Sequence, residues 1–383
     1  MADRTGDLTR NAVHVLPEGE LERKLSLGRP LRVKLGIDVT APDVTLGHAV
    51  PLQRMRAFQD AGHLGVLIVG DYTTRIGDPS GRSAERPILA EDEIDRNAKT
   101  YFEQAARIID RERTEVRFNS EWLGRLDFAG VLRLTRTATV ARLLERDDFA
   151  KRFAANAPIS VSELLYPLMQ AYDSVAVEAD VELGGTDQLY NLLAGREVMQ
   201  AYGVEPQLAL TVPLLVSYDG ARMSSSRGNY IGLAEAPEEQ FGKAMSVPDA
   251  LLGDWYRLVV ERVPDRRVEP MAAKLALARF IVARSHGEEA AERAEAHFTR
   301  VVREGRAPDE VPDAPLPPGD PVHLPAALAG AFGVSTSEAR RLIAGGAVRV
   351  GEEVTRELDW PRNRLDGAVV QVGKRRFARF TGP

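Results

Sequence analysis

Residues 31–48 read LRVKLGIDVTAPDVTLGH, and this stretch decides the fold. Its apolar side chains alternate with the period of two that a β-strand shows: Leu31, Val33, Leu35 and Ile37. Gly36 lets a ligand approach the strand closely, and the loop ends at Gly47, where a helix begins and presents unpaired N–H groups. The stretch therefore predicts a phosphate site, although a tight turn in the core of any α/β protein has the same pattern.

The composition indicates a globular chain with no general affinity for nucleic acid. The chain has 383 residues, of which 44% are hydrophobic and 28% charged, and its net charge is −6. This length suggests two or three domains, and any RNA surface must be a local patch. With no Cys, and with six His that lack metal-ligand spacing, we expect no structural metal site. No signal peptide or membrane span is recognisable, so we expect a soluble cytoplasmic protein.

The opening strand is followed by a second strand that ends in a polar loop. Residues 1–30 are polar with few apolar anchors, and we expect an N-terminal helix there. A helix is expected over 47–62, and the apolar run 65–69 predicts a strand buried on both faces. This strand leads into the glycine-rich loop 70–81. Open parallel sheets bind their ligands beside such loops.

A second group of polar residues lies between 162 and 190. Residues 90–160 read as helices, and then Tyr166, Gln170 and Asp173 lie at spacings of four and three, on one face of a helix. A polar surface stripe is the alternative interpretation. A strand is expected over 175–183, before Gly184-Gly185-Thr186-Asp187-Gln188, and another over 208–216. The loop 219–229 is then either a mobile part of the site or a surface linker.

The end of the chain has a different character. Residues 232–304 read as helical, and the six prolines within 306–322 predict a semi-rigid linker. A helix that begins at Ser335 and strands within 348–354 and 369–377 predict a small domain. Its ten basic residues, which include Lys374 and Arg375, stand against six acidic ones, a charge of +4. The tail is therefore a candidate RNA-binding module, or simply a solvated basic face.

Taken together, these segments resemble the bacterial tyrosyl-tRNA synthetases, which are class I aminoacyl-tRNA synthetases. The motifs that carry the resemblance are Thr-Leu-Gly-His at 45–48 (family form His-x-Gly-His), Ile-Gly-Asp-Pro-Ser-Gly at 76–81, Tyr-Pro-Leu-Met-Gln-Ala-Tyr-Asp at 166–173, Gly-Gly-Thr-Asp-Gln at 184–188 and Arg-Met-Ser-Ser-Ser at 222–226 (family form Lys-Met-Ser-Lys-Ser). The tail from Ser335 resembles an S4-type RNA-binding module. The resemblance implies a Rossmann-type α/β catalytic domain with a parallel sheet, an N-terminal helix and a helical insertion (1–230), a helical anticodon-side domain (231–305), the Pro-rich linker (306–322) and an S4-like α+β domain (323–383).

The resemblance also implies an activity and a role for each site residue. The chain would activate tyrosine with ATP, release pyrophosphate, and transfer the tyrosyl group to tRNA(Tyr), as a homodimer. Asp173 would bind the phenolic hydroxyl, and Gln188 would lie near the carboxylate. The α-ammonium would be held by Asp78, Tyr166 and Gln170. The residues around ATP would be Gly36, Asp38, Gly47, His48, Gly185, Asp187 and Met223, with Mg²⁺ held mainly by the phosphates. The catalytic residues would be Thr40, Thr45, His48, Arg222 and Ser225.

The chain departs from the family pattern mainly in its catalytic motifs. Thr45 replaces a His, and Arg222 and Ser225 replace two Lys; the other departures are Lys34, Val39, Thr74 and Arg75. Losing one transition-state donor typically costs about 10² to 10³ in rate, so two losses predict a poor enzyme unless the Thr45 hydroxyl and the charges of Arg222 or Arg75 compensate. Two alternatives stay open: a paralogue that activates tyrosine or an analogue for a small-molecule acceptor, and a non-catalytic RNA-binding relative. The retained amino-acid pocket argues against the second.

Overall fold

The computed structural model describes residues 6–80, 89–263, 267–304, 307–308, 311–373 and 376–382. Gly81 of the glycine-rich loop, Lys374 and Arg375 of the basic tail and part of the predicted linker lie outside these ranges. The chain divides into two compact units between Gly287 and Glu288. The predicted domain boundaries at 230, 305 and 322 stay predictions, and we describe each unit by itself.

The first unit is built on a six-stranded sheet in the order β1-β6-β5-β2-β3-β4. Its strands are β1 (His14–Leu16), β2 (Arg32–Asp38), β3 (Leu64–Gly70), β4 (Thr114–Phe118), β5 (Val181–Gly185) and β6 (Leu208–Val212). Five strands are parallel, and β1 pairs antiparallel with β6 at one edge. The strand order reverses between β2 and β5, which is where open parallel sheets bind their ligands. The predicted Rossmann-type α/β fold is confirmed.

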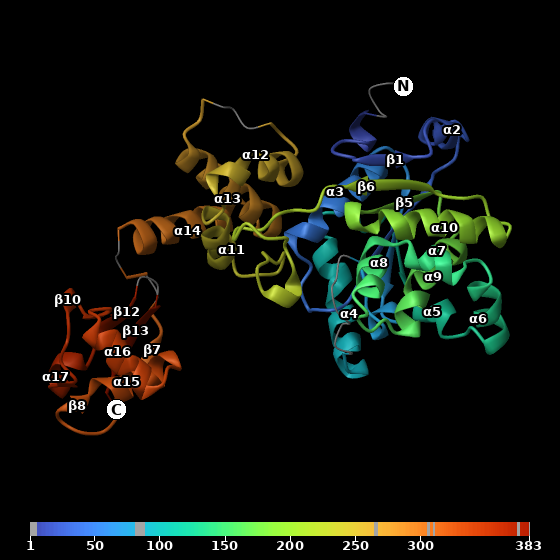
Figure 1. The fold of residues 1–383 in the computed structure, drawn as a ribbon. Helices are drawn as coiled ribbons and strands as arrows, with labels where there is room; N and C mark the ends of the chain where they lie inside the picture. The colour runs from blue at the N-terminus through green and yellow to red at the C-terminus, as the bar shows by residue number, and fades with distance from the viewer. Residues whose placement is uncertain are drawn as a thin grey trace. The chain divides into compact units, whose positions relative to one another are not determined.

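Helices cover both faces of this sheet (Figure 1). On one face, α3 (Leu46–Asp60) packs so closely on β3 that a Cβ at Gly65 would lie 2.9 Å from Gln59 Nε2. On the other face lie α9 (Val161–Ala176) and α10 (Leu189–Ala201), which pack side by side. The remaining helical segments of this unit are α2 (Glu20–Leu25), η1 (Thr73–Arg75), α4 (Glu91–Ala105), α5 (Ser120–Leu123), α6 (Phe128–Thr135), α7 (Val140–Leu144), α8 (Asp147–Ala154), η2 (Thr186–Gln188), η3 (Ser225–Arg227), α11 (Pro237–Met245), η4 (Asp249–Leu251), α12 (Leu252–Trp255), η5 (Tyr256–Val260) and α13 (Pro270–His286).

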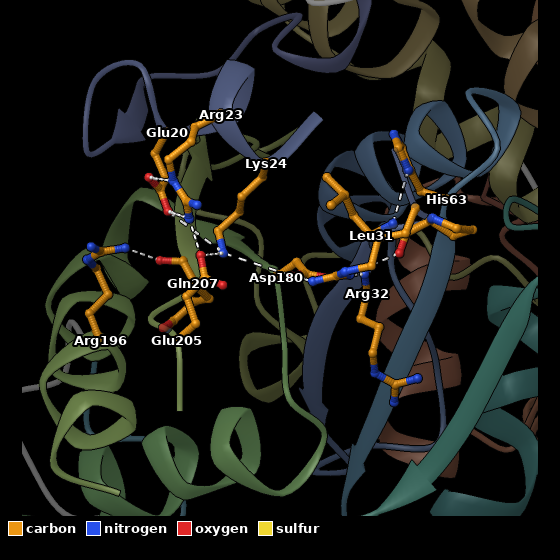
Figure 2. Close-up of polar contacts among 12 residues, drawn as sticks. Glu20, Arg23, Lys24, Leu31, Arg32, His63, Asp180, Arg196, Glu205 and Gln207 are labelled. Carbon is orange, nitrogen blue, oxygen red and sulfur yellow. Dashed lines mark hydrogen bonds and ion pairs between the residues drawn. The ribbon is translucent and has the colours of Figure 1, made fainter. Parts of the chain in front are cut away.

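A cluster of charged residues fastens α2 to the amino-terminal edge of the sheet, opposite the edge where ligands bind (Figure 2). The Lys24 side chain is fully buried, and its Nζ lies 3.5 Å from Glu205 Oε1, 3.7 Å from Glu20 Oε1 and 3.9 Å from Asp180 Oδ1. Asp180 also accepts two hydrogen bonds from the Arg29 guanidinium, at 2.7 and 2.8 Å. The segment from α2 to Arg29 is therefore tied to the start of strand β5, beside Asp180.

The second unit holds the C-terminal sheet, in the order β10-β9-β12-β13-β7. Apolar residues from its strands and helices form a common core that includes Leu324, Val370 and Phe380. Its elements are α14 (Glu288–Phe298), η6 (Thr299–Arg303), β7 (Asp313–Pro315), β8 (Val322–His323), α15 (Leu324–Phe332), α16 (Thr336–Ala344), β9 (Val348–Val350), β10 (Glu353–Val354), β11 (Asp359–Trp360), α17 (Arg362–Leu365), β12 (Val369–Val372) and β13 (Arg376–Thr381). Ser335 caps α16 as predicted, since its hydroxyl accepts from the Glu338 N–H.

Several secondary-structure predictions were wrong. Within 1–30 the chain forms the strand β1 as well as the helix α2, and within 90–160 it forms β4, a half-exposed edge strand without an apolar run. The strand expected over 175–183 begins only at Val181, because α9 continues to Ala176. β6 ends at Val212, since Pro213 has no N–H to donate to the sheet. The Pro-rich stretch contributes β7, which pairs with β13.

Candidate active site

A cavity of about 230 Å³ opens where β2 and β5 end, at the reversal of strand order. Fifteen of the sixteen predicted site residues line it: Gly36, Asp38, Thr40, Thr45, Gly47, His48, Asp78, Tyr166, Gln170, Asp173, Gly185, Asp187, Gln188, Arg222 and Met223. Ser225 is the exception, and lies in η3. The topology brings these residues together because the carboxyl ends of parallel strands share one edge of the sheet.

Asp173 lies on α9 at a buried position of this cavity, with only 3% of its surface exposed. Trp122 Nε1–H donates to its Oδ1 at 2.7 Å, and Asn119 Nδ2–H donates to its Oδ2 at 3.3 Å. Burial raises the pKa of the Asp173 carboxyl to about 7, against the opposing influence of the Lys34 ammonium and of these two hydrogen bonds. The carboxylate is thus held in one orientation with room to accept a further hydrogen bond from a ligand.

Asp38 and Tyr166 join the opening strand to α9 across the cavity. The Tyr166 hydroxyl donates to Asp38 Oδ2 at 2.9 Å, and the Thr73 hydroxyl donates to Asp38 Oδ1 at 2.8 Å. A Cβ at Gly70 would lie 2.5 Å from Asp38 Oδ1, so only glycine fits beside this carboxylate. Two strand ends and one helix therefore fix the position of Asp38.

Asp78 lies at the end of a chain of amide side chains. Its Oδ2 accepts from Gln188 Nε2 at 2.8 Å, and Asn191 Nδ2 donates both to Gln188 Oε1 at 3.0 Å and to Gln170 Oε1 at 2.9 Å. Arg146 extends the chain, because its guanidinium donates to Asn191 Oδ1 at 3.0 Å and lies 3.7 Å from Asp78. The polar groups at this end of the cavity thus orient one another.

His48 and Thr45 form the start of α3. The Thr45 hydroxyl accepts from the His48 backbone N–H at 3.4 Å, and His48 Nδ1 accepts from the Thr45 backbone N–H at 3.1 Å, which completes a capping box. Since Nδ1 accepts, the proton of the neutral ring is on Nε2. Burial lowers the pKa of His48 to about 4, so the ring is a neutral N–H donor at pH 7.

Arg222 belongs to the loop that closes one side of the cavity. Its Nη2 lies 2.5 Å from Asp187 Oδ2. Burial raises the pKa of Asp187, although the Arg222 cation opposes this effect. Asn229 holds the loop together, because its amide donates to Asp219 and to the Arg222 carbonyl and accepts from the Ser224 N–H.

Arg75 and Thr74, which also differ from the family pattern, do not line the cavity. Arg75 is exposed and pairs with Glu91 at 2.7 Å, so it does not supply the cation that the sequence suggested. The buried Thr74 hydroxyl accepts from the Val39 N–H at 3.0 Å and donates to the Gly70 carbonyl, which makes it part of the loop framework. Within the described residues, Arg222 is the one cationic side chain that lines this cavity.

Sequence reasoning missed several residues that hold the site together, among them Thr73, Asn119, Trp122 and Asn191. Asn119 follows directly after β4, so recognising that strand would have placed its side chain among the other strand ends. Trp122 and Asn191 lie on helices, and their sequence pattern carries no signal for a role in the site.

Comparisons with known proteins agree with this arrangement. The family described as tRNA synthetases class I (W and Y) matches residues 26–303. The chain is 49% identical to a curated tyrosine–tRNA ligase of Moorella thermoacetica, over 97% of this chain and 94% of that protein. It is 47% identical to that of Thermotoga maritima, over 98% of this chain and 96% of the other.

Solved structures share the fold. A tyrosyl-tRNA synthetase from Archaeoglobus fulgidus, solved in complex with L-tyrosine, is similar with a TM-score of 0.63 and 23% identity, over 77% of this chain and 99% of that one. A truncated mitochondrial tyrosyl-tRNA synthetase from Aspergillus nidulans also has a TM-score of 0.63, with 20% identity, over 75% of this chain and 90% of the other.

The chain therefore belongs to the class I tRNA synthetases of the tryptophan and tyrosine family. Within it, the similar curated proteins over nearly the full length are tyrosine–tRNA ligases. Membership makes the chain an ATP-dependent aminoacyl-tRNA ligase. No helix in the described ranges is long and apolar enough to cross a membrane.

Proposed function

We propose that this chain activates tyrosine with ATP and transfers the tyrosyl group to tRNA(Tyr). The observation that carries the proposal is the buried Asp173 carboxylate, fixed by Trp122 and Asn119 inside the cavity at the strand reversal. A carboxylate held in this way suits a donor hydroxyl such as the phenol of tyrosine, and phenylalanine would leave it without that partner. The relatives at 47–49% identity support the ligase over a small-molecule acceptor.

The amino-acid end of the cavity is acidic, which suits an α-ammonium group. Asp78, Tyr166 and Gln170 would hold this cation, and the Gln188 amide would lie near the carboxylate. In the first step a carboxylate oxygen of tyrosine bonds to the α-phosphorus of ATP. The bond from that phosphorus to the oxygen bridging to the β-phosphorus breaks, and pyrophosphate leaves.

The phosphate end has neutral and cationic donors. The α3 N-terminus lies at Gly47 and His48, and the helix dipole favours anions there. His48 Nε2–H and the Arg222 guanidinium would stabilise the charge that grows on the phosphate oxygens, with Thr40 and Thr45 beside them. Asp187 and Asp38 would accept from the hydroxyl groups of ATP. Ser225 would need a loop movement to take part, because it does not line the cavity.

Mg²⁺ would enter with ATP. No group of three or more His, Asp or Glu in the described part of the chain could hold a metal ion. Mg²⁺ commonly takes only one or two carboxylates and completes its oxygen shell from phosphates and water, so the phosphates of ATP would hold it in the main. The ion would supply charge neutralisation at the phosphates.

The C-terminal unit would bind tRNA through phosphate contacts. Arg340, Arg341 and Arg349 are exposed on it, around the capped helix α16 and the strand β9. Binding of this kind weakens as salt rises. The substrates ATP and tRNA imply a cytoplasmic location.

A homodimer is part of the proposal. Within residues 128–161 of the first unit five large apolar side chains are exposed: Phe128, Leu132, Val140, Phe153 and Val161, with exposures of 45 to 77%. Such residues commonly mark protein–protein contacts. Analytical ultracentrifugation of the whole chain and of Phe128→Asp/Phe153→Asp tests this, since the double variant should be monomeric.

ATP–pyrophosphate exchange across amino acids, followed by charging of tRNA(Tyr), tests the function. We expect exchange with tyrosine, no exchange with phenylalanine, and charging that Arg341→Glu/Arg349→Glu weakens without changing the exchange. Exchange without charging would favour the small-molecule acceptor, and absence of both would contradict catalysis.

A further inference from the structure

A buried ion pair lies directly beneath the cavity. Lys34 of β2 and Glu182 of β5 are partners in the register of the two strands where their order reverses, and the exposures of their side chains are 0% and 1%. Gly36 and Gly184 follow two residues further along the same strands and line the cavity, whereas Lys34 and Glu182 do not. Because alternate residues of a strand share a face, the pair points toward α9 just below the cavity floor.

Lys34 ties one turn of α9 to the sheet. Its ammonium donates to Glu182 Oε1 at 2.9 Å, to the Gln170 carbonyl at 2.9 Å and to the Ser174 hydroxyl at 2.8 Å. An ammonium has three donors, and all three are used. Asp173 lies between Gln170 and Ser174 in the sequence. The Lys34 ammonium therefore fixes the turn of α9 that carries Gln170 and Asp173, two of the residues predicted to bind tyrosine.

Glu182 determines the orientation of the Gln170 amide. Its Oε1 accepts from Gln170 Nε2 at 3.1 Å, and its Oε2 accepts from Ser174 at 2.9 Å and from Gln207 Nε2 at 2.8 Å. An ionised carboxylate can only accept, so Gln170 must turn its NH₂ group toward Glu182. Its Oε1 must then face Asn191 and the cavity.

The orientation of the Gln170 amide also fixes the amides of Asn191 and Gln188. Asn191 donates to both Gln170 Oε1 and Gln188 Oε1, which leaves Gln188 Nε2 to donate to Asp78. Each amide therefore has one orientation, set by an acceptor-only carboxylate at either end. The result is an acceptor oxygen of Gln170 facing the place where an α-ammonium is expected.

We propose that Lys34 and Glu182 are positioning residues of the amino-acid pocket: they fix the Gln170 amide and the Asp173 turn, and so set the affinity for tyrosine without touching it. This inference rests on the proposed function, because it assigns the ammonium to Gln170. The competing explanation is a purely structural ion pair, which would affect folding and every substrate alike. A buried ion pair is by itself weak evidence for stability.

The discriminating variant is Glu182→Met, which keeps the length of the side chain but removes the oxygen that accepts from both Lys34 and Gln170. The Gln170 amide can then flip and turn its NH₂ toward the ammonium. We expect the dissociation constant of tyrosine to rise about tenfold or more, as for the loss of a hydrogen bond to a charged group. The ATP KM should stay within about twofold, because ATP does not contact this turn in the proposed arrangement.

Gln207→Met is the matched control. It removes a hydrogen bond to the far oxygen of Glu182 and leaves the contact with Gln170 in place. It should lower the melting temperature at most, with tyrosine affinity unchanged. The double variant Lys34→Met/Glu182→Met controls for loss of folding in the single variant, because paired apolar replacements of a buried ion pair are often tolerated. It should fold and still bind tyrosine weakly.

Tyrosine binding is measured directly, by fluorescence of the whole protein, since Trp122 contacts Asp173. Pyrophosphate exchange then gives the KM values of tyrosine and ATP. Wild-type tyrosine affinity in Glu182→Met, or an equal change for both substrates that follows the loss of melting temperature, overturns the positioning role. Wild-type protein that binds tyrosine but supports no exchange contradicts the proposed function, and the binding titration still decides the inference.

Discussion

Arg222 and Asp187 form an ion pair in which the guanidinium Nη2 lies 2.5 Å from the carboxylate Oδ2. The arginine is half exposed on its loop, whereas the aspartate is largely buried in the cavity. In the proposed reaction the two side chains bind different parts of ATP, phosphate for the cation and hydroxyl groups for the carboxylate. ATP binding must therefore break the Arg222–Asp187 ion pair, and each of the two side chains then makes a contact with ATP in its place.

Replacing Arg222 tests its role on the phosphates. Arg222→Ala should lower the rate of tyrosyl-adenylate formation by about 10² to 10³, because a donor that acts in the transition state is lost. Arg222→Lys keeps the charge and should retain most of the rate. Single-turnover kinetics measure both. Arg227→Ala, an exposed arginine of the same loop, is the control and should react like wild type; equal losses in the two alanine variants would point to loop folding instead.

Asp173 should decide between tyrosine and phenylalanine. Asp173→Asn retains the shape of the side chain but removes the charge that accepts from the phenol. We expect the preference for tyrosine in pyrophosphate exchange to fall by at least about tenfold to a hundredfold, the usual cost of losing a hydrogen bond to a buried charged group. An unchanged preference in this variant would remove Asp173 from the phenol site.

Tyrosine affinity should depend on pH through Asp173. Burial raises the pKa of this carboxyl from 3.8 to about 7, so the ionised acceptor is lost as pH falls below 7, and the KM of tyrosine should rise while that of ATP does not. Trp122→Phe removes a hydrogen bond that favours the ionised form and should move the midpoint of the KM change to higher pH.

The free energy of unfolding depends on pH in the opposite direction. The folded state binds the Asp173 proton more tightly than the unfolded state, so the stabilising contribution of Asp173 is full below about pH 4 and lost as pH rises through 7.

The sequence predicted the site better than the scaffold that supports it. Periodicity predicted the strand ends and the helix face of α9, and the family resemblance assigned the site residues; fifteen of the sixteen converge on one cavity. Asn119 was missed because β4 is a half-exposed edge strand whose pattern resembles a helix surface. The pairing of Lys34 with Glu182 depends on strand order, which no local pattern encodes. Local sequence also could not show that Arg75, although it belongs to the glycine-rich loop 70–81, pairs with Glu91.

The charged cluster at the amino edge of the sheet should matter for stability and not for catalysis. Lys24→Met removes the buried cation among the carboxylates of Glu20, Asp180 and Glu205, which keep their pairs with Arg23 and Arg29. The expected loss of unfolding free energy is below the roughly 3–5 kcal/mol of a fully broken buried pair, because these arginines still neutralise the carboxylates. Urea unfolding measures this loss. Arg23→Ala removes an exposed cation of the same cluster and should cost less; an equal cost would mean that burial of Lys24 contributes nothing.

The last prediction concerns Thr45 and Ser225, where family members carry a histidine and a lysine. Thr45 lines the cavity and caps α3, so Thr45→His adds a donor near the phosphates but loses a hydroxyl cap worth about 1 kcal/mol. We expect adenylate formation to become about tenfold faster, equivalent to about 1.4 kcal/mol of transition-state stabilisation, together with a lower melting temperature. Thr45→Ala loses the cap and gains no donor, so it should be both slower and less stable.

Ser225→Lys should behave differently, because Ser225 lies in η3 away from the cavity lining. Its ammonium can reach the phosphates only if the loop that Asn229 holds together moves when ATP binds. If the loop moves, Ser225→Lys raises the single-turnover rate, and Asn229→Ala, which loosens the loop, enhances that gain. If the loop keeps this arrangement, the lysine has no effect with or without Asn229. A slower Thr45→His enzyme would show that the site is built around the smaller side chain, and that Thr45 is not simply a weaker replacement for the histidine donor of the family.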